Sequence, residues 1–255
     1  MPAVAYSVFP LLNVLGAAIA VFAAAMLAPL AVAFALDEGA LIAYDTAFLI
    51  TFGSGALLWL ATRRFRRELL PRDGFLLVTL IWTVLPAFST LPLLLHLPGL
   101  SFTDAYFETV SGLTTTGATT LSGLDALPAS INFWRCLLQW LGGMGIIVLV
   151  VAILPLLGVG GTQLFRAETA GPIKDAKLTP RITDTAIGLW GVYGAISAAC
   201  FLAYWAGGMG LLDAAMHMFT TMSLGGLSPY DASFGHFGSP LLDWIAVAFM
   251  AAASV

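Results

Sequence analysis

The 255-residue sequence is too apolar for a protein that folds in water: 60% of its residues are hydrophobic, 9% are charged and its mean hydropathy is +0.95. A soluble domain carries about 25% charged residues. The net charge is −4 and nine of the ten basic residues fall in two short clusters, which excludes a nucleic-acid-binding surface. Cys136 and Cys200 both lie in apolar runs, so the sequence offers neither a disulfide framework nor a cysteine metal site.

The apolar residues gather in runs that are long enough to cross a membrane, since a bilayer core about 30 Å thick needs roughly 20 helical residues. The five predicted spans are Phe9–Leu36, Thr46–Thr62, Gly74–Leu95, Phe133–Leu157 and Thr185–Ala206. The first is predicted to be retained, because no charged residue before Asp37 supplies the basic flank of a cleaved signal. A sixth run, from Pro240 to Val255, is shorter than a full crossing, and we expect an incomplete membrane helix there.

Two further segments, Thr103–Leu113 and Leu211–Met222, are helix-compatible but too short to span and too apolar for ordinary loops. Segments of this length are typical of re-entrant half-helices, which enter and leave the membrane on one side. The predicted fold class is therefore an all-α integral membrane protein. It comprises a leading two-helix hairpin and two repeats of span, pore half-helix, filter and span, as in potassium channels, with the second repeat truncated in its last span.

The charged residues predict the orientation of these spans. Nine of the ten bases follow the second and fourth spans, at Arg63, Arg64, Arg66, Arg67, Arg72, Arg166, Lys174, Lys177 and Arg181. Because basic loops stay in the cytoplasm, the N-terminus is predicted to be cytoplasmic. Nine of the fourteen acids then fall on the outer side or in its half-helices, where they would concentrate cations.

A short run of Thr, Ser and Gly follows each half-helix, TTTGATT at 114–120 and SLGGLS at 223–228. When Gly117 is aligned with Gly225, a hydroxyl residue stands two positions earlier in both runs. A filter of the TVGYG kind lines its pore with backbone carbonyls and needs Gly where other residues are strained. We therefore predict that carbonyl oxygens of Thr115, Thr116, Ser223 and Leu224 bind K⁺, and that the filter is shaped by Gly117, Ala118, Gly225 and Gly226.

Both repeats cross the membrane an even number of times, so they have the same orientation and are related by an axis along the membrane normal. We divide the chain into an N-terminal hairpin (1–68), a first pore repeat (69–165) and a second, truncated one (166–255). Two filter strands surround only half of an ion. We expect the ring to be completed by further repeats or by a second copy of the chain, because open backbone is not tolerated in lipid.

Four stretches resemble the Trk/Ktr/HKT superfamily of potassium transporters, and within it the N-terminal half of the TrkH-type bacterial subunits. They are AYFETVSGLTTTGATTL (105–121), FWRCLLQWLGGMGIIVLVVAILPLLGVGGTQLFRAETAGP (133–172), KLTPRITDTA (177–186) and AMHMFTTMSLGGLS (215–228). The resemblance covers nearly the whole chain. It implies a leading hairpin and four span–filter–span repeats around one pore, of which this sequence shows two. The family carries a gating loop and a pore-facing arginine in its third and fourth repeats, and these features are not found in this sequence.

The resemblance further implies potassium uptake through the bacterial inner membrane, with K⁺ as the transported ion. It implies a TrkA-like, nucleotide-binding cytoplasmic regulatory subunit as partner and a homodimer of the complete protein. The alternative is a truncated, non-conducting or assembly-only polypeptide of the same fold. An enzyme, such as an intramembrane protease, is not expected. A serine protease needs a histidine beside its serine, but the three histidines lie on the outer side or in an outer half-helix. An aspartyl protease needs two facing aspartates inside the membrane, but Asp45 and Asp243 stand at span ends, and no HExxH metal motif occurs.

Three ionisable residues near the half-helices leave alternatives open. Glu108 is expensive to ionise in a half-helix without a partner. Arg135, at the outer end of the next span, is predicted to pair with Glu108, to extend its charge toward the membrane surface, or to act in ion entry. His217 is predicted to be a hydrogen-bonded structural residue, and the alternatives are an ion ligand or a pH sensor.

Overall fold

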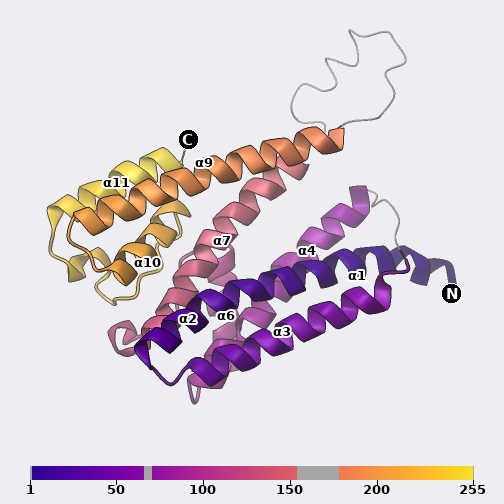
Figure 1. Cartoon of the computed structure of the whole chain (residues 1–255), viewed down its shortest axis with the longest axis horizontal. Coiled ribbons are helices and arrows are strands. Elements are labelled where there is room, and N and C mark those ends of the chain that lie inside the picture. The colour runs from indigo at the N-terminus through magenta and orange to yellow at the C-terminus, as the bar shows by residue number, and fades with distance from the viewer. Residues whose placement is uncertain (1, 66–70, 154–177, 255) are drawn as a thin grey trace, which may run out of the picture.

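The computed structural model describes residues 2–65, 71–153 and 178–254, and this part of the chain folds as helices joined by short loops (Figure 1). The helices are α1 (Pro2–Ala23), α2 (Leu27–Leu36), α3 (Leu41–Thr62), α4 (Pro71–Ser89), α5 (Leu91–His96), α6 (Phe102–Leu113), α7 (Ala129–Ile153), α9 (Leu178–Ala206), α10 (Leu211–Met222) and α11 (Pro240–Ala253). Short 3₁₀ turns join α1 to α2, precede α7 and precede α11, at Ala24–Met26, Leu124–Ala126 and Ser233–His236.

The described residues contain four helical segments that are long and apolar enough to cross a membrane. They are Val8–Leu36, Leu41–Thr62, Asp73–His96 and Thr185–Ala206, which confirms four of the predicted spans. The fifth predicted span, Phe133–Leu157, overlaps α7, which has 25 residues and begins four residues earlier, at Ala129; residues 154–157 lie outside the described part. The apolar helix α11 is shorter, with 14 residues. The predicted all-helical membrane fold is confirmed.

Helices α1 and α3 form the leading hairpin and lie side by side along most of their length (Figure 1). Two glycines allow this close approach. A Cβ atom at Gly16 would lie 2.7 Å from the backbone nitrogen of Trp59, and one at Gly55 would lie 2.5 Å from that of Ala20. Small residues at such crossings are the usual means by which membrane helices pack closely. The Asn13 amide adds a hydrogen bond to the Trp59 carbonyl at 3.0 Å.

Helices α6 and α10 are the two predicted half-helices, each of 12 residues. Their first and last residues differ by the same shift of 109 positions, from 102 to 211 and from 113 to 222. Helix α7 packs against both half-helices and against α9, and it runs diagonally between the two groups of helices in Figure 1. A Cβ atom at Gly142 of α7 would overlap the carbonyl group of Leu113, so α7 touches the end of α6 directly.

We predict that Gly55→Ala destabilises the hairpin, because its new methyl group would meet backbone atoms that cannot move aside. Overpacking of this kind costs about 1–3 kcal/mol. The matched control is Gly53→Ala on the same helix, where a Cβ atom meets nothing within 4 Å. That control is expected to be neutral or slightly stabilising, by up to about 1 kcal/mol. Melting temperatures of the purified proteins in detergent provide the measurement, and equal values for the two variants would contradict the packing argument.

Candidate functional site

The two half-helices end in the same backbone motif. In α6 the N–H of Thr116 donates to the Ser111 carbonyl at 2.9 Å, and in α10 the N–H of Gly225 donates to the Thr220 carbonyl at 3.0 Å. The residue before each donor is left-handed, with φ of 54° at Thr115 and 56° at Leu224. This is the Schellman motif, which usually has Gly at the left-handed position. Two non-glycine residues there indicate that the surrounding structure imposes the turn.

The register between the two runs differs by one residue from the predicted one. Gly117 has φ of 78° and its counterpart, at the shift of 109, is Gly226 with φ of 76°. The alignment of Gly117 with Gly225 is therefore wrong. From sequence alone either Gly225 or Gly226 could be aligned with Gly117. The hydrogen bonds at the helix ends decide, because Gly225 donates to the end of α10 as Thr116 donates to the end of α6. In the corrected register Thr115 corresponds to Leu224, Thr116 to Gly225 and Ala118 to Leu227, while Ser223 corresponds to Thr114 at the helix end.

The structure brings the two runs together at their glycines. A Cβ atom at Gly117 would overlap the carbonyl oxygen of Gly225, so strand 1 (residues 115–118) touches strand 2 (residues 223–227) at this point. Gly225 has no left-handed φ, and its small size is needed because a Cβ atom would lie 2.6 Å from Oε1 of Gln139. The two glycines of strand 2 are thus required for different reasons: Gly225 for space and Gly226 for conformation.

Several backbone oxygens of the two strands remain unpaired. Within the part of the chain that the structure describes, no hydrogen bond is donated to the carbonyls of Thr115, Thr116, Ser223 or Leu224. Beyond these positions, the carbonyls of Leu227 and Ser228 are not free, because they accept from α7 side chains. Free carbonyls at membrane depth can replace the hydration shell of a cation, because each oxygen carries partial negative charge.

One face of α7 holds strand 2 and the residues after it. The side chains on this face have the spacing i, i+3, i+4, i+7 of one helical stripe: Asn132, Arg135, Cys136 and Gln139. They bind consecutive backbone groups. Asn132 Nδ2 donates to the Pro229 carbonyl at 3.2 Å, and Arg135 Nη1 donates to the Ser228 carbonyl at 3.2 Å. Cys136 Sγ donates to the Leu227 carbonyl at 3.9 Å, and Gln139 Oε1 accepts from the Leu227 N–H at 3.0 Å. Asn132, Cys136 and Gln139 were not predicted as site residues, although polar residues at helical spacing in an apolar span are a usable signal.

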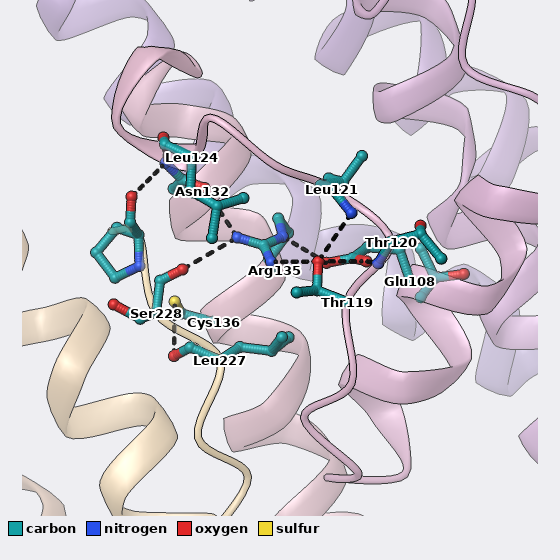
Figure 2. A network of polar contacts seen from close by, with 12 residues as sticks. Glu108, Thr119, Thr120, Leu121, Leu124, Asn132, Arg135, Cys136, Leu227 and Ser228 are labelled. Carbon is teal, nitrogen blue, oxygen red and sulfur yellow. Dashed lines mark hydrogen bonds and ion pairs between the residues drawn. The ribbon is translucent and has the colours of Figure 1, made fainter. Parts of the chain in front are cut away.

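Arg135 also reaches the first repeat, as Figure 2 shows. Its Nε donates to Glu108 Oε1 at 2.7 Å, and both side chains are buried, with 1% and 0% exposed. The Glu108 carboxylate further accepts from the Thr119 hydroxyl at 2.9 Å and from the Thr120 N–H at 3.2 Å. Pairing is thus the observed state, and the alternative in which Arg135 extends to the membrane surface is wrong. A direct role of Arg135 in ion entry stays a prediction. The guanidinium joins both filter runs through charge-assisted hydrogen bonds.

His217 stands in the second repeat where Glu108 stands in the first, 109 positions later. It is buried, and its Nδ1 lies 2.8 Å from the Asp213 carbonyl, whereas its Nε2 has no hydrogen-bond partner among the described residues. The Tyr230 hydroxyl donates to Asp213 Oδ1 at 2.8 Å. Burial, followed by this hydrogen bond, raises the pKa of Tyr230 to about 12, so its phenol remains a donor at neutral pH. The two repeats therefore support their filter runs with different chemistry.

Comparison with known proteins decides the family. The TrkH family, described as cation transport protein, matches residues 41–255. The chain belongs to this family. It is 49% identical over 94% of its length to the Trk system potassium uptake protein TrkH of Vibrio parahaemolyticus, and 49% identical over 93% to that of Escherichia coli K12. The crystal structure of the potassium transporter TrkH from Vibrio parahaemolyticus superposes with a TM-score of 0.84 and 45% identity, over 94% of this chain.

The match to these TrkH relatives is partial on their side. The chain spans 50% of the length of the two TrkH sequences and 48% of the crystallised chain. The membrane fold is thus shared with the corresponding half of a TrkH protein.

We predict that the buried Arg135–Glu108 pair contributes to stability mainly when complete. Arg135→Ala leaves a buried carboxylate without its partner, and breaking such pairs costs about 3–5 kcal/mol. The double variant Arg135→Ala, Glu108→Ala is expected to lose less than the sum of the single losses, because neither charge is then stranded. Thermal unfolding of the four proteins in detergent measures this coupling, and strictly additive losses would show that the pair is not an energetic unit.

Proposed function

We propose that this chain supplies half of a potassium-selective pore for uptake across the bacterial inner membrane. The observation that carries the proposal is the pair of filter strands in one register of 109 residues, which meet at Gly117 and Gly225 and keep four carbonyls free. Of the four predicted K⁺ ligands, Thr115, Thr116 and Leu224 remain proposed through their carbonyl oxygens, whereas the corrected register aligns Ser223 with Thr114 at the end of its half-helix. The relatives named potassium uptake proteins support K⁺ as the transported ion.

A cavity beside strand 2 supports the view that a further strand completes the ring. It has a volume of about 340 Å³ and lies between strand 2, α10 and α11. Four α11 residues that line it occupy the fourth, seventh, eighth and eleventh helix positions: Asp243, Ala246, Val247 and Met250. These are the positions that Asn132, Arg135, Cys136 and Gln139 occupy on α7, where strand 2 is seated. We propose that further repeats, or a second copy of the chain, place the next strand there.

The proposed orientation puts the N-terminus in the cytoplasm. Arg63 and Arg64, at the end of α3, are exposed, whereas Arg66, Arg67 and the basic residues between 166 and 177 lie outside the described residues. We propose that these basic loops face a TrkA-like nucleotide-binding subunit, and that the complete protein is a homodimer. The division at residues 68 and 165 into a hairpin and two pore repeats is part of the same proposal. The competing function is a non-conducting or assembly-only polypeptide of the same fold.

We predict that the left-handed glycines are needed for selective transport. Residues 1–255 joined to the C-terminal half of the Vibrio parahaemolyticus TrkH would be tested for rubidium uptake with sodium competition, in cells that lack other potassium uptake. Gly226→Ala adds about 1–2 kcal/mol of backbone strain, and Gly117→Ala adds a collision with the Gly225 carbonyl. Both should lower uptake or selectivity at least tenfold, with Gly117→Ala the more severe.

The matched control for these glycine variants is Gly123→Ala in the outer loop. Gly123 has φ of 69° and open space around it, so the substitution introduces the same strain away from the filter. Uptake and selectivity should stay near the original values in the control. If both filter variants also behave like the control, the filter assignment fails. If the original chimaera carries no rubidium at all, the non-conducting alternative is favoured.

We predict that the α3–α4 loop is cytoplasmic and that the loop after the first filter run is outside. Arg64→Cys and Ser122→Cys place thiols at exposed positions on the two proposed sides. An impermeant maleimide applied to intact cells should label Ser122→Cys alone, and Arg64→Cys should react after lysis. The two native cysteines are buried and provide an unreactive background. Labelling of Arg64→Cys in intact cells would reverse the proposed orientation.

A further inference from the structure

Gln139 is fully buried on α7, behind the point where the two filter strands meet. Its Oε1 accepts the N–H of Leu227 at 3.0 Å. The donor at Leu227 determines which way the amide faces, because a backbone N–H can bind the side-chain oxygen but not the amino group. The amino group therefore points away from Leu227.

The amino nitrogen of Gln139 has no hydrogen-bond partner among the described residues. A Cβ atom at Gly225 would overlap this carboxamide, and a Cβ atom at Gly117 would lie 3.7 Å from Nε2. The group thus touches strand 2 and is close to strand 1. An unpaired buried donor is costly, and an apolar side chain of similar size would avoid that cost. Among the described residues, the bond to Leu227 and the close fit to Gly225 are the contacts that favour an amide here.

We propose that Gln139 is a positioning residue that determines ion selectivity by holding strand 2 at a fixed distance from strand 1. Leu227 N–H is the anchor, and the carboxamide is the surface against which Gly225 rests. Since a filter discriminates between cations through the number and placement of its carbonyls, a strand released from this anchor would accept smaller ions more readily. This inference rests on the proposed function, because it assigns a role at the same filter.

The sequence context agrees with a positioning role. Gly225 and Gly226 adjoin the anchor and are the least restrained residues of strand 2, since glycine has the widest choice of backbone conformations. A strand with two successive glycines needs an external restraint to keep its carbonyls in one direction. In strand 1 the matching pair is Thr116 and Gly117, which has a single glycine. The anchor is thus present at the more flexible strand.

The test uses the chimaera described above and measures rubidium uptake as a function of sodium. Gln139→Met keeps the volume but removes the acceptor, and it should reduce the preference for rubidium over sodium about three- to tenfold, which corresponds to the loss of one hydrogen bond. Gln139→Asn keeps an amide on a side chain that is shorter by one methylene, and it should reduce the preference for rubidium over sodium by a smaller factor.

The matched control is Ser130→Ala, which removes another buried and unpaired polar atom from the same helix without touching the filter strands. It should leave the selectivity ratio unchanged. If Gln139→Met does not reach the membrane, Gln139→Asn provides the same test with a smaller change. Folded Met and Asn variants with the original selectivity would overturn this inference alone. A chimaera without uptake would overturn the proposed function, and with it this inference.

Discussion

The structure depends on one polar stripe within an apolar helix. The polar face of α7 presents a thiol and an amide to strand 2, and a guanidinium and a second amide to the two residues that follow it, Ser228 and Pro229. Irregular backbone inside a membrane must find partners within the protein, because lipid offers none. Helix α7 satisfies this need for the neighbouring repeat, and so adds to the hydrogen bonds that Leu124 and Asp125 already form with Asp231 between the two repeats. The buried Arg135–Glu108 pair extends the same connection back to the first filter run.

The helical architecture could be predicted from sequence because the length and composition of apolar runs distinguish membrane spans from half-helices. The ends of α10 agree with the prediction residue for residue, and those of α6 nearly so. The resemblance to a family also followed from contiguous motifs. What composition could not determine was the register of the second strand, because two adjacent glycines offer two alignments of equal quality. That choice depends on hydrogen bonds at the end of α10, which are set by three-dimensional packing.

The supporting residues were harder to predict than the filter itself. Arg135 and Glu108 were candidates because single charges in apolar segments are expensive. Gln139 and Cys136 are uncharged and lie among leucines, so each alone is unremarkable in sequence. Their role emerges only when a strand from the next repeat, about ninety residues later in the chain, is placed against them. In such long-range pairing the helix that supplies the side chains shows a helical spacing of polar residues, whereas the strand that is bound through its backbone shows no sequence pattern.

The difference between Glu108 and His217 has a consequence for the evolution of the fold. If the two repeats descend from one duplicated unit, their supports have since diverged, one toward a buried ion pair and the other toward a histidine among the rings of Tyr230, Phe234 and Phe237. The copies are then no longer interchangeable: a unit transplanted from one position to the other would bring a charge without its counter-charge. Such mutual dependence between neighbours would preserve the order of the units within a single chain and hinder a return to separate, identical subunits.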